Sequence, residues 1–280
     1  MNLRRITSTS NAVIKEAARL HRKRHRYESR LFLAEGEDLL DAALERGAAP
    51  RQVFVLEGNE EQILGKGETR FPEALSPQAA ERLEIFICGR DAMAKLSALG
   101  SGARVISVFE MLDRKFPAGS DSSSSAAGPL LYLVAVGDPG NVGTLLRSGA
   151  ALGAAAAALG PETADPYSPK SLRATMGAIF QIPLYLTVNP EAVVAWADNS
   201  DAGVVCADAH AGEPVWKAPL EAGFVLVLGS EREGIPHRLQ QAATSTVRIP
   251  QVGETESINV AMAGTAILYE ALRQRSPGRQ

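Results

Sequence analysis

Hydrophobic positions in the first 110 residues alternate between helical and strand spacing. Residues 11–24 predict an amphipathic helix with Ser10 as its N-cap, on an apolar stripe of Val13, Ile14, Ala17 and Leu20. Helices are also predicted at 37–46, which Gly47 can end in a left-handed conformation, and at 91–99. Short apolar runs predict strands at 31–36, 53–57, 84–89 and 104–110. This alternation indicates a small α/β domain over residues 1–112.

The pattern restarts after a segment without apolar periodicity, AGSDSSSSAAG at 118–128. Such a composition cannot bury enough surface to fold, so residues 113–128 are predicted to be a flexible linker between two domains. Beyond it, strands are predicted at 130–136, 224–228 and 246–250, and helices at 142–152 and 257–273. Residues 129–280 therefore form a second and larger α/β domain, with a parallel sheet flanked by helices.

Composition narrows the class of protein. Of the 280 residues, 45% are hydrophobic and 22% are charged, which is typical of a globular protein with hydrophobic cores. No apolar run is long enough to span a membrane, and no apolar stretch follows the basic N-terminus as in a secretory signal. Cys88 and Cys206 form no CxxC, and the four histidines show no ligand spacing, so no metal site is expected. These features predict a cytoplasmic protein.

Basic residues crowd the first thirty positions, although the whole chain has a net charge of −3. The cluster is Arg4, Arg5, Lys15, Arg19, Arg22, Lys23, Arg24, Arg26 and Arg30, opposed there only by Glu16 and Glu28. Such asymmetry favours contact with a polyanion, because each cation that neutralises a phosphate releases counterions. A solvated helix face remains the alternative.

Three predicted strands end in loops rich in glycine and polar residues: GDPGNVG at 137–143, GSEREG at 229–234 and IPQVGETESIN at 249–259. In open α/β sheets, ligands gather at the carboxyl ends of strands, where helix N-termini present unpaired N–H groups. The spacing matches neither a GxGxxG dinucleotide loop, a phosphate-binding P-loop nor a GxSxG hydrolase elbow. The loops suit an adenosine-bearing ligand that is held by backbone groups.

Three ordered stretches resemble the signature motifs of the SpoU-type (TrmH-like) RNA ribose 2′-O-methyltransferases of the SPOUT superfamily. They are DPGNVGTLLRSGAALGA at 138–154, LVLGSEREGIP at 226–236 and IPQVGETESINVAMAGTAILYE at 249–270. The family's usual sequence pattern also resembles residues 165–183, DPYSPKSLRATMGAIFQIP. Residues 6–44 resemble the family's N-terminal substrate-binding domain, which has a fold like that of ribosomal protein L30e.

The resemblance implies a fold, a cofactor and partners. The second domain would contain a deep C-terminal trefoil knot that binds S-adenosylmethionine, with Gly229, Ile249 and Ile258 at the cofactor. The partners would be RNA, with ribosomal 23S RNA favoured over transfer RNA by the N-terminal domain, and a second copy of the chain. The candidate dimer surfaces are the apolar faces of helices 142–152 and 257–273.

The resemblance also assigns site residues. The catalytic set would be Asn141, Arg147, Glu231, Ser257 and Asn259, and the RNA-binding set Arg19, Arg22, Lys23, Arg24, Arg26, Lys170 and Arg173. Family accounts often make the arginine a base, but a guanidinium keeps its proton, so Arg147 is expected to bind phosphate and stabilise developing alkoxide charge.

Each assignment has an ordinary alternative. Asn141 fits a turn, Ser257 fits a helix N-cap, and Glu233 competes with Glu231 for the same role. Arg147, and the pair Lys170 and Arg173, also fit solvated surface positions. For the whole protein, the alternatives are a transfer RNA 2′-O-methyltransferase and a catalytically silent RNA-binding or ribosome assembly factor of the same fold.

Overall fold

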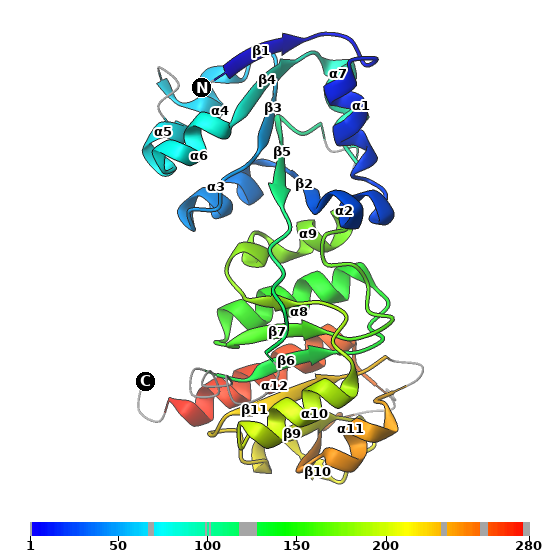
Figure 1. The fold of residues 1–280 in the computed structure, drawn as a ribbon. Helices are drawn as coiled ribbons and strands as arrows, with labels where there is room; N and C mark the ends of the chain where they lie inside the picture. The colour runs from blue at the N-terminus through cyan, green and yellow to red at the C-terminus, as the bar shows by residue number, and fades with distance from the viewer. Residues whose placement is uncertain are drawn as a thin grey trace. The chain divides into compact units, whose positions relative to one another are not determined.

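The structure, a computed structural model, describes residues 2–66, 70–98, 100, 102–117, 128–230, 234–252 and 257–276. The chain divides into two compact units, which Figure 1 shows in ribbon form. The N-terminal unit comprises Met1–Met111 and the separate segment Asp165–Phe180. The C-terminal unit comprises Leu112–Ala164 and Gln181–Gln280. The predicted α/β class is confirmed in both units.

The N-terminal unit contains a mixed five-stranded sheet. Its strands are β1 (Asn2–Ile6), β2 (Leu31–Glu35), β3 (Gln52–Leu56), β4 (Glu84–Cys88) and β5 (Val105–Glu110), in the order β1-β4-β3-β5-β2. The strands β1, β4 and β3 are parallel, whereas β5 is antiparallel to both β3 and β2. The middle three residues of β2 and β3 are buried, as their apolar runs predict.

Helices cover both faces of this sheet. They are α1 (Ala12–Arg19), α2 (Lys23–Ser29), α3 (Glu37–Glu45), α4 (Glu60–Leu64), α5 (Arg70–Ala74), α6 (Pro77–Arg82), α7 (Arg90–Leu96), α9 (Pro169–Thr175) and the 3₁₀ turn η3 (Ala178–Phe180). The apolar stripe of α1 packs with α7 in one core, through Ile14, Ala17 and Leu20. Gly47 follows α3 with a φ of 68°, as its predicted role as a stop requires.

The first predicted helix is wrong in its extent. It starts one residue after Asn11, which is the N-cap in place of Ser10, and it ends at Arg19. The guanidinium of Arg26 donates to the carbonyl oxygens of Leu20 (2.7 Å) and His21 (2.9 Å). These bonds satisfy carbonyls that helix termini leave unpaired, so α1 can stop there and α2 can begin at Lys23.

The segment Asp165–Phe180 belongs to the N-terminal unit, although the sequence analysis placed it in the second domain. Tyr167 packs on Phe32 with ring centres 4.8 Å apart, and Phe180 packs on Phe109 at 5.0 Å. A Cβ atom on Gly177 would lie 2.3 Å from the Cβ of Ala42, so only glycine allows this approach. The first unit is therefore completed by residues from later in the chain.

The C-terminal unit contains a seven-stranded parallel sheet in the order β10-β12-β9-β11-β6-β7-β8. Its strands are β6 (Leu130–Leu133), β7 (Ala156–Leu159), β8 (Leu184–Tyr185), β9 (Gly203–Ala207), β10 (Glu213–Pro214), β11 (Phe224–Leu228) and β12 (Ser245–Arg248). Every residue of β6 and β11 is buried, as expected of central strands in a parallel sheet.

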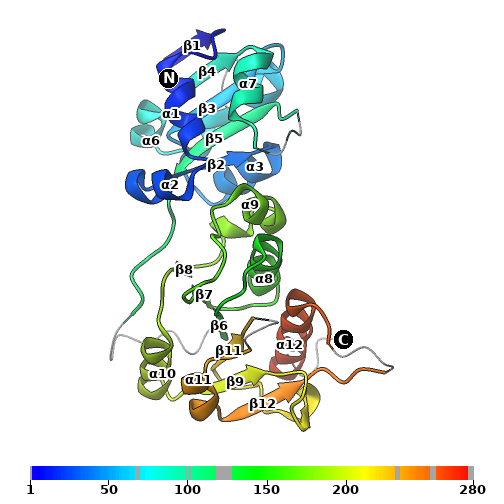
Figure 2. The same ribbon diagram turned by 90° about the vertical axis from the view of Figure 1, so that its right-hand side faces the viewer.

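Two pairs of helices enclose this sheet. The helices α8 (Pro139–Ala151) and α12 (Val260–Arg275) lie on one face, and α10 (Pro190–Asn199) and α11 (His237–Ala242) on the other (Figure 2). A Cβ atom on Gly264 of α12 would lie 2.5 Å from both Leu145 of α8 and Leu228 of β11. Glycine at this position thus lets α12 pack closely on α8 and on the sheet.

Part of the predicted linker is ordered. Arg114 donates its backbone N–H to the carbonyl of Leu184, and Phe116 packs on Tyr185 with ring centres 5.3 Å apart. Residues 112–117 therefore belong to the C-terminal unit, whereas 118–127 lie outside the described residues. Over the described part of the chain, no helix has both the length and the apolar character needed to cross a membrane.

Candidate active site

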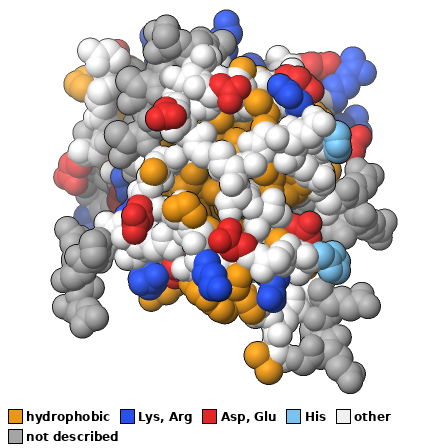
Figure 3. Space-filling view, turned by 90° about the horizontal axis from the view of Figure 1, so that it is seen from below, with side chains coloured by type: hydrophobic (Ala, Val, Ile, Leu, Met, Phe, Trp, Pro, Cys, Tyr) orange, Lys and Arg blue, Asp and Glu red, His pale blue; other side chains and the backbone are white. Residues whose placement is uncertain are grey.

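A cavity of about 610 Å³ opens at the carboxyl ends of β9, β11 and β12, where the predicted ligand-binding loops begin. Its walls include apolar side chains from these strands and from α12, among them Leu228, Val247, Ile249, Ile258 and Ile267. This volume is typical of sites for small organic ligands. Figure 3 shows one face of the molecule, where hydrophobic side chains gather centrally and charges of both signs surround them.

The three residues predicted to contact the cofactor all line this cavity. They are Gly229, which follows β11, Ile249, which follows β12, and Ile258, which precedes α12. A Cβ atom on Gly229 would lie 2.3 Å from the carbonyl oxygen of Gly234, so a side chain there would force the loop open. Ser257, predicted as catalytic, also lines the cavity. The second and third motifs therefore share one pocket.

Two further lining residues were missed by the sequence analysis. Gln251 lines the cavity, and its Oε1 atom is buried and has no hydrogen-bond partner among the described residues. Cys206 is also at the wall, and burial raises the pKa of its thiol to about 12. It is therefore a neutral, small apolar group at physiological pH. An orphaned acceptor has no signature in sequence.

The first motif is joined to the third by a pair of asparagines. Asn259 is the N-cap of α12, and its Oδ1 accepts from the backbone N–H groups of Ala261 (2.9 Å) and Met262 (3.3 Å). Its Nδ2 donates to Oδ1 of Asn141 at 3.0 Å. Asn259, not Ser257, therefore caps the helix. Asn141 lies within α8 rather than in a turn, with Asp138 as the cap of that helix.

The remaining predicted catalytic residues lie in different surroundings. Arg147 is exposed on α8 and makes no hydrogen bond or ion pair with a described residue. One turn of α8 is tied to α12 by the hydroxyls of Ser148 and Thr265, which are 2.7 Å apart. Glu231 and its competitor Glu233 lie outside the described residues. The predicted knot also stays a prediction, because the loops at 231–233 and 253–256 are not described.

The predicted RNA-binding residues fall into two groups. Arg26 was wrong as an RNA contact: its side chain is buried and its guanidinium is paired with Asp165. The other six are exposed on the N-terminal unit: Arg19, Arg22, Lys23 and Arg24 near α1 and α2, and Lys170 and Arg173 on α9. Arg19 and Arg24 each form an exposed ion pair, with Glu16 and Glu28 respectively.

The second unit has a parallel α/β sheet with a ligand cavity at the carboxyl ends of its strands, and the solved structures that the chain resembles are RNA methyltransferases. An S-adenosylmethionine-bound rRNA methyltransferase from Sinorhizobium meliloti superposes with a TM-score of 0.82 and 30% identity, over 97% of this chain and 98% of that one. The SpoU methyltransferase AviRb from Streptomyces viridochromogenes, in complex with S-adenosylmethionine, gives 0.78 and 27%, over 96% and 100%.

Residues 129–269 match the model of the SpoU rRNA methylase family, and the chain belongs to that family. Residues 11–106 match the MRM3-like substrate binding domain. Among curated relatives, the 23S rRNA (guanosine(2553)-2′-O)-methyltransferase RlmP of Bacillus subtilis is 29% identical over 270 residues, which cover 95% of this chain and 98% of RlmP.

The cavity fits the family's cofactor, S-adenosylmethionine. Its apolar walls suit the adenine ring, and the buried acceptor of Gln251 offers a partner to an N–H donor of the ligand. The residues that would hold it are Gly229, Ile249, Gln251 and Ile258.

Replacing Gln251 by leucine is expected to weaken S-adenosylmethionine binding by up to about tenfold, the effect of one hydrogen bond of about 0.5–1.5 kcal/mol. Calorimetric titration of the purified protein measures this change. An unchanged affinity would show that Oε1 of Gln251 meets no ligand donor.

Asn259→Ser separates the two roles of Asn259. Serine keeps the N-cap, so the free energy of unfolding should change by less than about 0.5 kcal/mol, but it is too short to reach Asn141. Methyl transfer should fall about tenfold, the equivalent of about 1.4 kcal/mol in the barrier. The matched control is Asn189→Ser, which makes the same substitution at the N-cap of α10, a helix that does not line the cavity. Equal activities of the two variants would contradict a role for the contact with Asn141.

Proposed function

We propose that this protein transfers the methyl group of S-adenosylmethionine to a ribose 2′-hydroxyl of 23S ribosomal RNA. The observation that carries the proposal is the bond between Asn141 and Asn259, which holds the first motif against the third at the end of the cavity that the second and third motifs line. The names of the full-length relatives supply the substrate class, since RlmP of Bacillus subtilis is a 23S rRNA 2′-O-methyltransferase.

The neutral polar residues of the site orient the reacting groups. The cofactor supplies an electrophilic methyl group on a sulfonium when it is bound. Asn141, Ser257 and Asn259 offer donors and acceptors that position the ribose without placing a charge next to that sulfonium. Glu231 is part of the proposed catalytic set by its place in the second motif.

Arg147 acts as a fixed cation in the proposed reaction. A guanidinium keeps its proton in proteins, so Arg147 binds an RNA phosphate and stabilises the negative charge that develops on the ribose oxygen. Its exposure on α8 supports contact with a large substrate, because no described carboxylate neutralises it.

The N-terminal unit supplies the RNA-binding cations in this proposal. Contacts from exposed lysine and arginine to phosphates position structured RNA, which is recognised chiefly by its shape. A ribosomal RNA substrate also places the protein in the cytoplasm, where ribosomes are assembled. A silent assembly factor of the same fold would bind the cofactor and RNA but leave the ribose unmethylated.

Arg147→Gln is expected to lower the rate of methyl transfer about 10²–10³-fold, the effect of removing one donor that stabilises developing oxyanion charge. Its affinity for S-adenosylmethionine should remain within about twofold of wild type, because the cofactor is held by other loops. The assay measures 2′-O-methylation of 23S rRNA from cells that lack this protein. Arg238→Gln, an exposed arginine on α11, is the control. Failure of the wild-type protein to methylate this RNA would refute the proposed function.

A homodimer is also proposed, with α12 at its interface. This helix exposes 67% of Met262 and 61% of Tyr269, two large apolar residues seven positions apart and therefore on one face. Large exposed apolar residues that share a face are typical of protein interfaces. The family resemblance makes a second copy of the chain the expected occupant.

Met262→Glu is expected to convert the dimer to a monomer, because it places a charge within the apolar interface. Light scattering should give twice the mass of one chain for wild type and the mass of one chain for the variant. A monomeric wild-type protein would contradict the proposed interface.

A further inference from the structure

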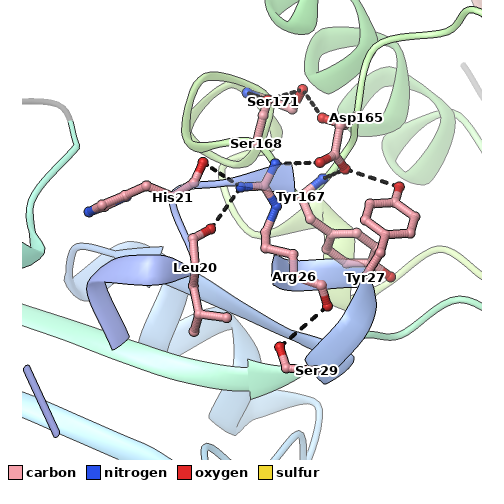
Figure 4. Close-up of polar contacts among 9 residues, drawn as sticks. All are labelled: Leu20, His21, Arg26, Tyr27, Ser29, Asp165, Tyr167, Ser168 and Ser171. Atoms are coloured by element: carbon pink, nitrogen blue, oxygen red, sulfur yellow. Dashed lines mark hydrogen bonds and ion pairs between the residues drawn. The ribbon is translucent and has the colours of Figure 1, made fainter. Parts of the chain in front are cut away.

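The buried guanidinium of Arg26 is the most constrained cation of the N-terminal unit. Its relative exposure is 3%, and it donates to the carbonyls that end α1 and to Oδ2 of Asp165, 139 positions later in the chain (Figure 4). A buried charge is stable only when it is paired and hydrogen-bonded. Both terminal nitrogens of Arg26 have such partners, whereas its Nε is buried without one among the described residues. Arg26 thus fixes the junction between α1 and α2 to the segment that carries α9.

Asp165 continues this connection into α9. Its Oδ1 accepts from the backbone N–H of Tyr167 (2.9 Å) and from the Tyr27 hydroxyl (3.3 Å). Its backbone carbonyl accepts from the Ser171 hydroxyl at 2.9 Å, within the first turn of α9. Figure 4 shows these side chains converging between the α1–α2 junction and the start of α9. Asp165 therefore binds Arg26 through its carboxylate and the first turn of the helix that bears Lys170 and Arg173 through its backbone carbonyl.

The α1–α2 junction and α9 meet at a small hollow. Arg173 and His21 line the same small hollow of the N-terminal unit, and Arg22 directly follows His21. Lys170 lies one turn before Arg173 on the exposed side of α9. The two helices thus bring cations from distant parts of the chain onto one surface.

Three of the acidic groups nearby pair with basic side chains, whereas Glu35, which lines the same hollow as Arg173, accepts from Ser97 and the backbone N–H of Ala98. Glu16 contacts Arg19 and His25, Glu28 forms an ion pair with Arg24, and Asp165 forms an ion pair with Arg26. Arg22 and Arg173 have no ion pair with a described residue. Arg22 and Arg173 are thus two exposed cations of this unit that remain available to a phosphate backbone.

We propose that Arg26 and Asp165 are positioning residues that hold Lys170 and Arg173 beside Arg22, so that the three cations form one phosphate-binding surface for structured RNA. The proposal rests on the proposed RNA substrate and deepens it, because it replaces a single N-terminal basic arm by a surface assembled from two distant segments. Arg26 itself touches no RNA.

Asp165→Asn separates this role from simple electrostatics. The substitution removes a negative charge, so charge alone predicts tighter RNA binding. Loss of positioning predicts the opposite: about tenfold weaker binding to a 23S rRNA transcript, with the slope of log affinity against log salt reduced by about one to two, as two phosphate contacts are lost. Arg26→Lys keeps the charge but lacks the planar guanidinium, so it should weaken RNA binding by less than Asp165→Asn does. It replaces Asp165→Asn in this test if that variant does not fold.

A double-mutant cycle tests the connection directly. Arg173→Gln should weaken binding about threefold in the wild-type background and have almost no effect in the Asp165→Asn background, where its contact is already lost. Arg51→Met, which breaks an exposed pair with Glu110 in the same unit, is the matched control and should leave the cycle additive. Thermal unfolding followed by circular dichroism reports whether each variant is folded, and calorimetric S-adenosylmethionine binding, which depends on the other unit, should be unchanged.

Equal effects of Arg173→Gln in both backgrounds, or tighter RNA binding by Asp165→Asn, would overturn the positioning role. Methylation of 23S rRNA by the wild-type protein would persist in that case, and the proposed function would stand. Absence of wild-type methylation together with a coupled cycle would instead refute the function and leave the surface intact.

Discussion

The amide of Asn259 takes part in three hydrogen bonds at the point where the third motif becomes α12. Two of them close the N-terminus of that helix, and the third reaches Asn141 at the start of α8. The same two helices pack through Gly264 and through the hydroxyls of Ser148 and Thr265. The contact between the first and third motifs therefore depends on one neutral side chain whose position is fixed by helix capping.

A second constraint concerns the division of the chain. The segment 165–180 lies within the match to the methylase family at 129–269, yet it folds with the substrate-binding unit. Its aromatic contacts and the buried pair of Arg26 and Asp165 make it part of that core. The boundary between the family matches is consequently not the boundary between compact units, and a fragment ending at residue 111 would expose apolar surface around Phe32 and Phe109.

Several elements were predictable because their signals are local. The central strands, the helix predicted at 142–152 and the stop at Gly47 are set by apolar spacing and by backbone preferences within a few residues, although α8 begins three residues earlier, at Pro139 within GDPGNVG. The second and third motif loops also identified the end of the sheet where the cavity lies. The break between α1 and α2 was missed because no glycine or proline marks it in the sequence, while the carbonyls at the break are bound by the side chain of Arg26.

Sequence by itself determined the α/β class, the motifs and their order, since periodicity and glycine-rich loops are properties of neighbouring residues. Tertiary structure alone decided that Arg26 is buried rather than exposed, because its partner Asp165 is 139 positions away. It likewise decided that Asn141 meets Asn259 across 118 positions and that the buried Oε1 of Gln251, a residue at the cavity wall, is left without a partner among the described residues. Charge and residue type say which bonds a side chain can make, but only packing of distant segments selects the partner and excludes the water that would otherwise take its place.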